Sequence, residues 1–164
     1  MLKILFVCTG NTCRSPIAAF LFKNELKLDP LPYSVEVFSA GLAALEGAKV
    51  AEPVKDLLSD RGIGDIAGHR AVRLSKNMVE ESDLIFVMTA DQLCHLRSLF
   101  PEAEGKTYLL TDYASNGESI RDIKDPYGKE FENYQESLED IHNWIKKIML
   151  KLKGGYQHEA GSGQ

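Results

Sequence analysis

The sequence lacks any apolar stretch long enough to cross a membrane. Its longest apolar run near the start covers residues 4–7, which is only the length of a strand. The first residues also lack the basic region, the apolar core and the small-residue cleavage site of a secretory signal peptide. These absences predict a cytoplasmic protein that does not contact a membrane.

Cysteine and positive charge are both scarce. The chain has three cysteines among 164 residues. An odd number this small does not form a disulfide scaffold, so we expect reduced thiols. It has 19 Lys and Arg residues against 24 Asp and Glu residues, and its net charge of −5 gives no electrostatic case for nucleic-acid binding. An anionic ligand would therefore need a local positive site.

Two kinds of apolar segment alternate along the chain. Short β-rich runs indicate strands, and apolar residues at helical spacing indicate helices. Strands are predicted at 2–7, 33–39, 84–88 and 106–110, and helices at 17–26, 53–61, 74–81, 91–100 and 130–153. This alternation is typical of an α/β fold with a parallel sheet covered on both faces. In such sheets ligands bind beyond the carboxyl ends of the strands.

The remaining segments are polar. Ser75 and Thr89 are predicted to cap the helices that follow them. Residues 111–127 are predicted to form a long loop, and a loop of this length in a compact domain usually has a function. We expect residues 1–153 to form a single domain and the Gly-rich residues 154–164 to form a disordered tail.

The clearest functional motif directly follows the first predicted strand. Residues 8–14 read C-T-G-N-T-C-R, with Cys8 and Arg14 separated by five residues and with Ser15 next. Five residues can curl so that their backbone N–H groups point inward above a helix N-terminus, which is a cradle for a phosphate dianion. We expect Gly10 to take a backbone conformation closed to other residues and Asn11 to tolerate left-handed geometry.

These residues predict a specific chemistry. Arg14 supplies a planar charged fork that matches two phosphate oxygens. The helix end, the inward N–H groups and Arg14 favour the thiolate of Cys8, to which Ser15 or Thr9 could donate a hydrogen bond. The thiolate would attack phosphorus in line and form a phosphocysteine. The expected phosphate-binding loop therefore comprises Thr9, Gly10, Asn11, Thr12, Cys13, Arg14 and Ser15.

A leaving group also needs a proton donor, for which Asp125 in D-P-Y-G is the best candidate. It would act as an acid in the first half-reaction and as a base on water in the second. An Asp-Pro pair more often only forms a turn, and a Cys-x5-Arg spacing alone occurs by chance. The strand before the motif, the Ser-Pro helix start after it and the long loop around Asp125 favour the functional interpretation. The chemistry requires no metal and no cofactor.

Taken together, these motifs make the sequence similar to the low-molecular-weight protein tyrosine phosphatase family, and the resemblance covers nearly the whole length before the tail. The resemblance rests on CTGNTCRSP, on Ser39-Ala40-Gly41, on Gly68-His69-Arg70, on the LIFVM strand and on D-P-Y-G before the last helix. It implies a flavodoxin-like three-layer sandwich with a four-stranded parallel sheet. It also implies Cys8 as the nucleophile, Arg14 as the phosphate ligand, Asp125 as the general acid and Asn11 as a loop brace tied to Ser39 and His69. Phosphorylated proteins would be the partners, and we expect a monomer.

Thr12 points to a subtype of the family. Members that act on phosphotyrosine usually carry a bulky aliphatic residue here, whereas the bacterial protein arginine phosphatase branch resembles CTGNTCRS. A polar, smaller residue suits a guanidinium leaving group, and residues 42–47 lack an aromatic ring for stacking on a phenyl group. Tyr127 is a candidate pocket wall. The same loop pattern occurs in bacterial members that act on tyrosine, so phosphoarginine is favoured and phosphotyrosine stays open.

The other two cysteines bear on regulation and on rival functions. In the family, a cysteine at the position of Cys13 can form a reversible disulfide with the nucleophile, although a small buried packing residue is an equal interpretation. Cys94 is predicted to be a core residue. A thiol-linked arsenate reductase of similar fold needs further relay cysteines, and a non-catalytic phosphoprotein-binding module needs neither a thiolate nor an acid. Both rivals are therefore less favoured.

Overall fold

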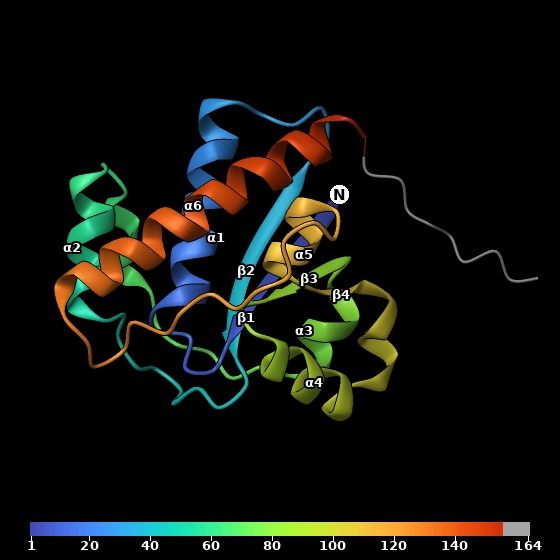
Figure 1. Ribbon diagram of the computed structural model, residues 1–164, viewed down its shortest axis with the longest axis horizontal. Helices are drawn as coiled ribbons and strands as arrows, with labels where there is room; N and C mark the ends of the chain where they lie inside the picture. Colours follow the sequence, from blue (N-terminus) through green and yellow to red (C-terminus); the bar gives the residue numbers. More distant parts are fainter. Residues whose placement is uncertain (156–164) are drawn as a thin grey trace, which may run out of the picture.

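A four-stranded parallel sheet forms the centre of the protein in the computed structural model, which describes residues 1–155 (Figure 1). The strands are β1 (Leu2–Cys8), β2 (Val35–Gly41), β3 (Leu84–Val87) and β4 (Thr107–Leu109). Their order is β2-β1-β3-β4, and every neighbouring pair is parallel. Cys8 pairs with Gly41 at the carboxyl end of β1, so the motif cysteine lies where ligands bind in such sheets. The predicted α/β sheet is confirmed.

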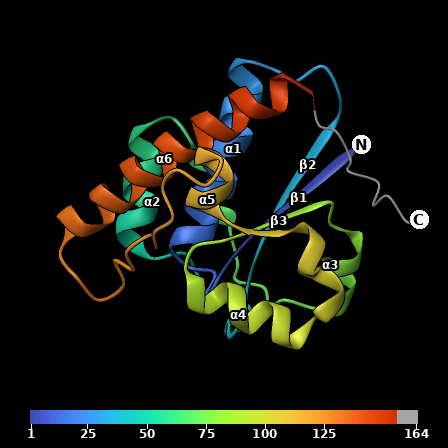
Figure 2. The ribbon, with the colours of Figure 1, turned by 45° about the vertical axis from the view of Figure 1, so that its right-hand side comes forward.

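Helices cover both faces of this sheet (Figures 1 and 2). One face carries α1 (Arg14–Leu28), α5 (Leu110–Ser115) and α6 (Phe131–Lys153), with α2 (Glu52–Asp60) beside α6. The other face carries α3 (Lys76–Glu81) and α4 (Ala90–Leu99). Two short 3-10 segments, η1 (Gly64–Gly68) and η2 (Pro101–Lys106), join these elements. This is the three-layer flavodoxin-like arrangement that the resemblance implies.

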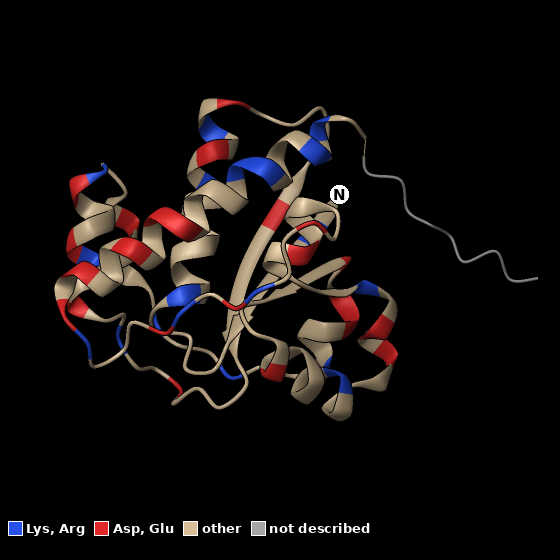
Figure 3. Ribbon diagram, viewed as in Figure 1, with Lys and Arg blue, Asp and Glu red and all other residues tan. Residues whose placement is uncertain are grey.

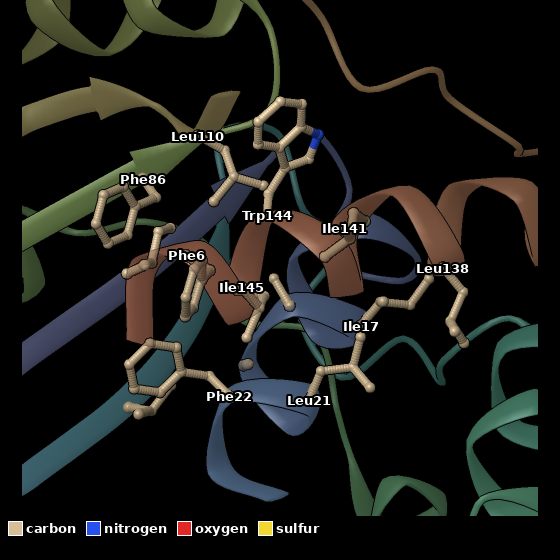
Figure 4. Close-up of a cluster of buried hydrophobic side chains, with 14 of the residues drawn as sticks. Phe6, Ile17, Leu21, Phe22, Phe86, Leu110, Leu138, Ile141, Trp144 and Ile145 are labelled. Atoms are coloured by element: carbon tan, nitrogen blue, oxygen red, sulfur yellow. The ribbon is translucent and has the colours of Figure 1, made fainter. Parts of the chain in front are cut away.

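The side chains of β1 explain why its sequence is apolar apart from Lys3. Ile4 and Phe6 join a core with α1 and α6, where the Phe6 ring stacks on Phe86 with centroids 5.5 Å apart (Figure 4). Leu5 and Val7 point the opposite way into a second cluster with α3 and α4. Each fully buried side chain of this kind stabilises the fold by roughly 1.5–3 kcal/mol. A strand buried on both faces has no polar side, which is why no alternation marks it.

Local signals in the sequence set several helix ends. Ser75 accepts a hydrogen bond from the Met78 N–H at the start of α3. Thr89 forms a full capping box with Gln92 at the start of α4, each side chain binding the other residue's backbone N–H. Both predicted caps are therefore confirmed.

Several predicted boundaries differ from the structure, and tertiary contacts explain two of the differences. The helix α5 (Leu110–Ser115) replaces the end of a predicted strand and the start of a predicted loop, since Leu110 and Ala114 are buried in the α6 core. The second strand covers Val35–Gly41, two residues later than predicted, and the Tyr33 hydroxyl before it donates to the carbonyl of Leu152. The first helix begins at Arg14, inside the motif.

Charged residues are distributed unevenly along α6. Acidic residues lie toward the start of the helix, and Lys residues gather toward its end, which is the favourable arrangement for the helix dipole (Figure 3). Within residues 1–155, no helix combines the length and the apolar character of a membrane span. Residues 156–164 of the predicted tail lie outside the described residues.

Candidate active site

The 8–15 loop connects the end of β1 to the start of α1 and turns its carbonyl oxygens outward. These oxygens accept backbone N–H groups from the neighbouring segment: Leu42 to Cys8 and Ala43 to Thr9 at 2.9 Å, and Ala51 to Thr12 at 3.0 Å. The N–H groups of residues 10–13 have no hydrogen-bond acceptor within residues 1–155. Above the N-terminus of α1, such a ring of donors is suited to an anion.

Asn11 holds this loop in shape from inside the protein. It is fully buried and adopts a left-handed conformation with φ of 55°, as its residue type predicts. Its side-chain nitrogen donates to the hydroxyls of Ser39 and Ser15 at 2.9 Å each, and its side-chain oxygen accepts from the Val72 N–H at 3.0 Å. Its carbonyl accepts from His69 Nε2 at 2.9 Å, so the two ties expected for Asn11 are both present.

His69 binds the loop in a defined protonation state. The Asn11 carbonyl can only accept, so Nε2 of His69 carries the proton that it donates. Burial lowers the pKa of His69, the hydrogen bond opposes this shift, and the charges of Lys23 and Arg70 add to it. Neutral His69 therefore serves as the donor.

The glycine that this loop requires is Gly41 rather than Gly10. Gly10 does not adopt a positive φ, and a Cβ on it would meet only the Thr12 hydroxyl at 3.6 Å, so the expectation for Gly10 was wrong. A Cβ on Gly41 would lie 2.6 Å from the carbonyl oxygen of Thr9 and 3.0 Å from the Asn11 nitrogen. β2 can approach the loop this closely only where the side chain is absent.

Cys8 lies buried at the base of the loop with its sulfur next to Ser15. The Sγ–Oγ distance is 2.9 Å. The Ser15 oxygen already accepts a hydrogen bond from Asn11, so its own O–H can point at the sulfur, while the alternative acceptor, the Ala40 carbonyl, is farther away at 3.4 Å. Of the two hydroxyls expected to contact the sulfur, the structure therefore places Ser15 there.

Arg14 links the loop to a segment more than 100 residues away. Its Nη1 donates to the Ile123 carbonyl at 3.0 Å, and its Nη2 lies 3.4 Å from Oδ2 of Asp125. The Arg14 side chain is only 6% exposed, whereas that of Asp125 is 55% exposed. The structure thus brings the predicted phosphate ligand and the predicted acid together.

The 116–130 loop that carries Asp125 is attached to the sheet and to α6. The Ile123 N–H donates to the Met88 carbonyl at the end of β3, and the Ser137 hydroxyl donates to the Lys124 carbonyl. Asp122 accepts from the Ala90 N–H and so caps α4. These bonds hold Asp125 over the carboxyl end of the sheet.

A cleft of about 510 Å³ separates the two loops. Its lining residues are Thr9, Arg14, Leu42, Ala43, Thr89, Asp91, Gln92, His95, Asp122, Ile123, Lys124 and Asp125. Sequence reasoning missed Gln92, although the capping-box pattern marks it, and missed Ile123, which no local signal marks. Tyr127 is not among the lining residues; its side chain is 72% exposed, and its N–H donates to Asp125. A larger cavity, of about 910 Å³, lies away from the motif beside Tyr108 and Lys151.

The two remaining cysteines have different surroundings. Cys13 is buried and free, and burial raises its pKa to about 11, so its thiol is protonated at neutral pH. Cys94 is exposed on α4, so the prediction that it is a core residue was wrong; Gln92 and Leu96 are the buried residues of that helix. Within the described residues, no group of three or more His, Cys, Asp and Glu side chains could hold a metal ion.

Comparisons with known proteins agree with this geometry. Residues 3–158 match the family model described as low molecular weight phosphotyrosine protein phosphatase. A protein-arginine-phosphatase from Geobacillus stearothermophilus is 38% identical over 151 residues, which cover 92% of this chain and 96% of that protein. A probable low molecular weight protein-tyrosine-phosphatase, EpsP, from Ralstonia nicotianae is 35% identical over 149 residues, which cover 88% and 94%. A solved YwlE arginine phosphatase mutant with a phosphorylated active site serine superimposes with a TM-score of 0.88 at 29% identity, covering 94% of this chain and 97% of that one.

Proposed function

Because the chain belongs to the low molecular weight phosphotyrosine protein phosphatase family, we propose that it removes phosphate from phosphorylated protein side chains through a phosphocysteine on Cys8. One observation carries this proposal: a buried cysteine sulfur lies at the base of an N–H ring whose Arg14 also contacts Asp125. The anion cradle and the acid therefore meet at Arg14, and the nucleophile lies at the base of the cradle.

In the first half-reaction the Cys8 thiolate attacks phosphorus and the bond from phosphorus to the side chain breaks. The Ser15 hydroxyl stabilises the thiolate, and the N–H ring and Arg14 stabilise the charge on the equatorial oxygens. Asp125 gives its proton to the departing side-chain atom. The products are the free side chain, phosphocysteine and the Asp125 carboxylate.

In the second half-reaction water attacks the phosphocysteine. The Asp125 carboxylate takes a proton from the water, the S–P bond breaks, and inorganic phosphate leaves with the Cys8 thiolate restored. The phosphorylated active site serine in the YwlE mutant supports this scheme, since there the phosphoryl group resides on the residue that replaced a cysteine.

Phosphoarginine is the substrate side chain that we favour. Thr12 lies in the ring where tyrosine-directed members usually carry a bulky residue, and two relatives that share this family are named protein-arginine-phosphatase. Asp125 is also exposed at the cleft, where a carboxyl oxygen can accept a hydrogen bond from a guanidinium N–H.

Redox control by Cys13 is a second part of the proposal. Peroxide would oxidise the Cys8 thiolate to a sulfenic acid, and the Cys13 thiol would condense with it to give a disulfide and water. Both cysteines are free and buried on the same short loop, and Cys13 is held as a thiol.

An arsenate reductase relay would need a further cysteine, and Cys94, on α4, is the only other one.

The test compares phosphoarginine and phosphotyrosine peptides of the same sequence. We expect the wild type to prefer phosphoarginine and Cys8→Ser to lower turnover by at least roughly 10⁴-fold while the fold is retained. Thr12→Ile should raise the ratio of phosphotyrosine to phosphoarginine turnover by about tenfold, whereas Thr12→Ser should not. A Cys8→Ser variant with wild-type turnover would contradict the mechanism, and an unchanged ratio in Thr12→Ile would contradict the substrate assignment alone.

A further inference from the structure

Gln92 is a buried polar side chain at the wall of the cleft. It lies in the first turn of α4 and is 5% exposed. Its side chain reaches from α4 to the 8–15 loop, where it contacts Thr9. The amide therefore connects the end of β3 with the residue that follows Cys8.

The hydrogen bonds of Gln92 leave its amide only one orientation. Its Oε1 accepts from the N–H groups of Met88 and Thr89, at 2.9 and 3.1 Å. Two backbone donors require the oxygen at that end, so the nitrogen must face Thr9. Nε2 lies 3.1 Å from Thr9 Oγ1 and donates to it.

This orientation fixes the direction of the Thr9 hydroxyl proton. Because Oγ1 accepts from Gln92, its proton must point elsewhere, and within residues 1–155 it has no other hydrogen-bond partner. Thr9 is exposed and lines the cleft together with Arg14. Its backbone is held separately by the bond from Ala43, so the side chain is not needed to anchor the loop.

We propose that Gln92 is a positioning residue that directs the Thr9 hydroxyl proton into the cleft, where Thr9 donates it to an oxygen of the bound phosphoryl group. This inference rests on the proposed function, and it adds a side-chain donor to the backbone ring. Gln92 itself does not contact the substrate; it acts by preventing Thr9 from turning its proton inward.

Replacing Gln92 with Glu tests the direction of this bond with almost no change of shape. One carboxylate oxygen still accepts from Met88 and Thr89, but the other can only accept from Thr9, so the proton turns away from the cleft. We expect kcat/KM for p-nitrophenyl phosphate to fall by about tenfold or more, and the inhibition constant of inorganic phosphate to rise by a similar factor. The loss should shrink as pH falls and the new carboxyl becomes protonated.

Thr9→Val and Thr9→Ser separate the hydroxyl from the fold. Valine has the shape of threonine without the donor, so we expect about a tenfold loss in kcat/KM and phosphate affinity. Serine keeps the donor and should stay within about threefold of the wild type. Since Thr9 is exposed, both variants should fold even if Gln92→Glu does not.

The double variant decides whether Gln92 acts through Thr9. In the Thr9→Val background, Gln92→Glu should lower kcat/KM much less than it does in the wild type. The loss that remains should reflect only the added negative charge. Gln135→Glu, an exposed substitution of the same kind on α6, is the charge control and should leave activity unchanged.

Equal losses from Gln92→Glu in both backgrounds, or a Thr9→Val variant with wild-type constants, would overturn the inference. A wild-type protein that neither hydrolyses p-nitrophenyl phosphate nor binds phosphate would instead overturn the proposed function and this inference with it.

Discussion

The two loops that face the cleft are built in opposite ways. In the 8–15 loop, Asn11, Arg14 and Ser15 are buried, and every one of them has a defined partner. In the 116–130 loop, Asp125 and Tyr127 are largely exposed, and the loop is attached through the backbone of Ile123 and Lys124, the Asp122 carboxylate and the buried Ile123 side chain. The functional side chains of the first loop are thus buried, whereas Asp125 of the second lies at the surface.

The proposed mechanism accounts for this difference. The phosphoryl group is the same in every substrate, so a ring of donors fixed before binding lowers the cost of reaching the transition state. The leaving side chain belongs to a protein and must be reached from outside, so its proton donor has to remain accessible. The contrast predicts that changes in the first loop affect all substrates and that changes in the second depend on the leaving group.

Among the tests of this contrast, the largest effect should come from Arg14→Lys, which keeps the charge of the buried loop but removes the planar guanidinium. Lysine cannot bind two phosphate oxygens and the Ile123 carbonyl together, so we expect kcat/KM to fall by about 10²–10³-fold for every substrate. Arg121→Lys is the matched control, because Arg121 lies in the other loop and pairs with Asp140 at the surface. Steady-state kinetics would contradict the contrast if both variants behaved alike.

For Asp125→Asn we expect an effect that depends on the leaving group and that is smaller than the effect of Arg14→Lys when the leaving group is good. The amide cannot supply the proton, so phenyl phosphate, with a poor leaving group, should lose about 10²–10³-fold in kcat. For p-nitrophenyl phosphate, whose leaving group needs little help, the loss should be about tenfold. Asp56→Asn, on the exposed side of α2, provides the control. A uniform loss across leaving groups would show that Asp125 is not the acid.

Stability should distinguish the two glycines near the buried loop. Gly41→Ala forces a Cβ to within 2.6 Å of the Thr9 carbonyl, and we expect about 3 kcal/mol lower free energy of unfolding, near the upper end for overpacking. Gly10→Ala meets only a side-chain atom at 3.6 Å and should change stability by less than about 1 kcal/mol. Urea denaturation measures both, and equal losses would mean that the close approach of β2 is not what the loop depends on.

The smallest effect concerns the pH dependence of stability at His69. Its pKa is lower in the folded state, so in mildly acid solution the unfolded chain binds the proton first. Stability should therefore fall as pH drops below about 6.5, the ordinary pKa of histidine, and His69→Gln should lose this component. Free energies of unfolding at several pH values test it, with the exposed His95→Gln as control. A His69→Gln variant with the wild-type slope would contradict the assignment.

Particular residues show how far sequence reasoning reached. The motif at residues 8–15, the caps Ser75 and Thr89 and the long α6 are all local patterns, and each was predictable. The roles of Gly41, Gln92 and Ile123 were not predicted, because they depend on groups from distant segments: the Thr9 carbonyl, the Thr9 hydroxyl and the Arg14 guanidinium. Cys94 was placed wrongly because helical spacing alone does not tell which face of a helix meets the sheet.

The sequence by itself determined the parallel α/β order, the anion-binding turn and the candidate nucleophile, since hydrophobic period and short-range backbone preferences are properties of neighbouring residues. Only the tertiary structure decided which glycine the loop cannot replace, which hydroxyl faces the Cys8 sulfur and which end of the Gln92 amide faces Thr9. Those outcomes depend on the close approach of chain segments that are far apart in sequence. Hydrogen-bond directions are set only when all partners are in place.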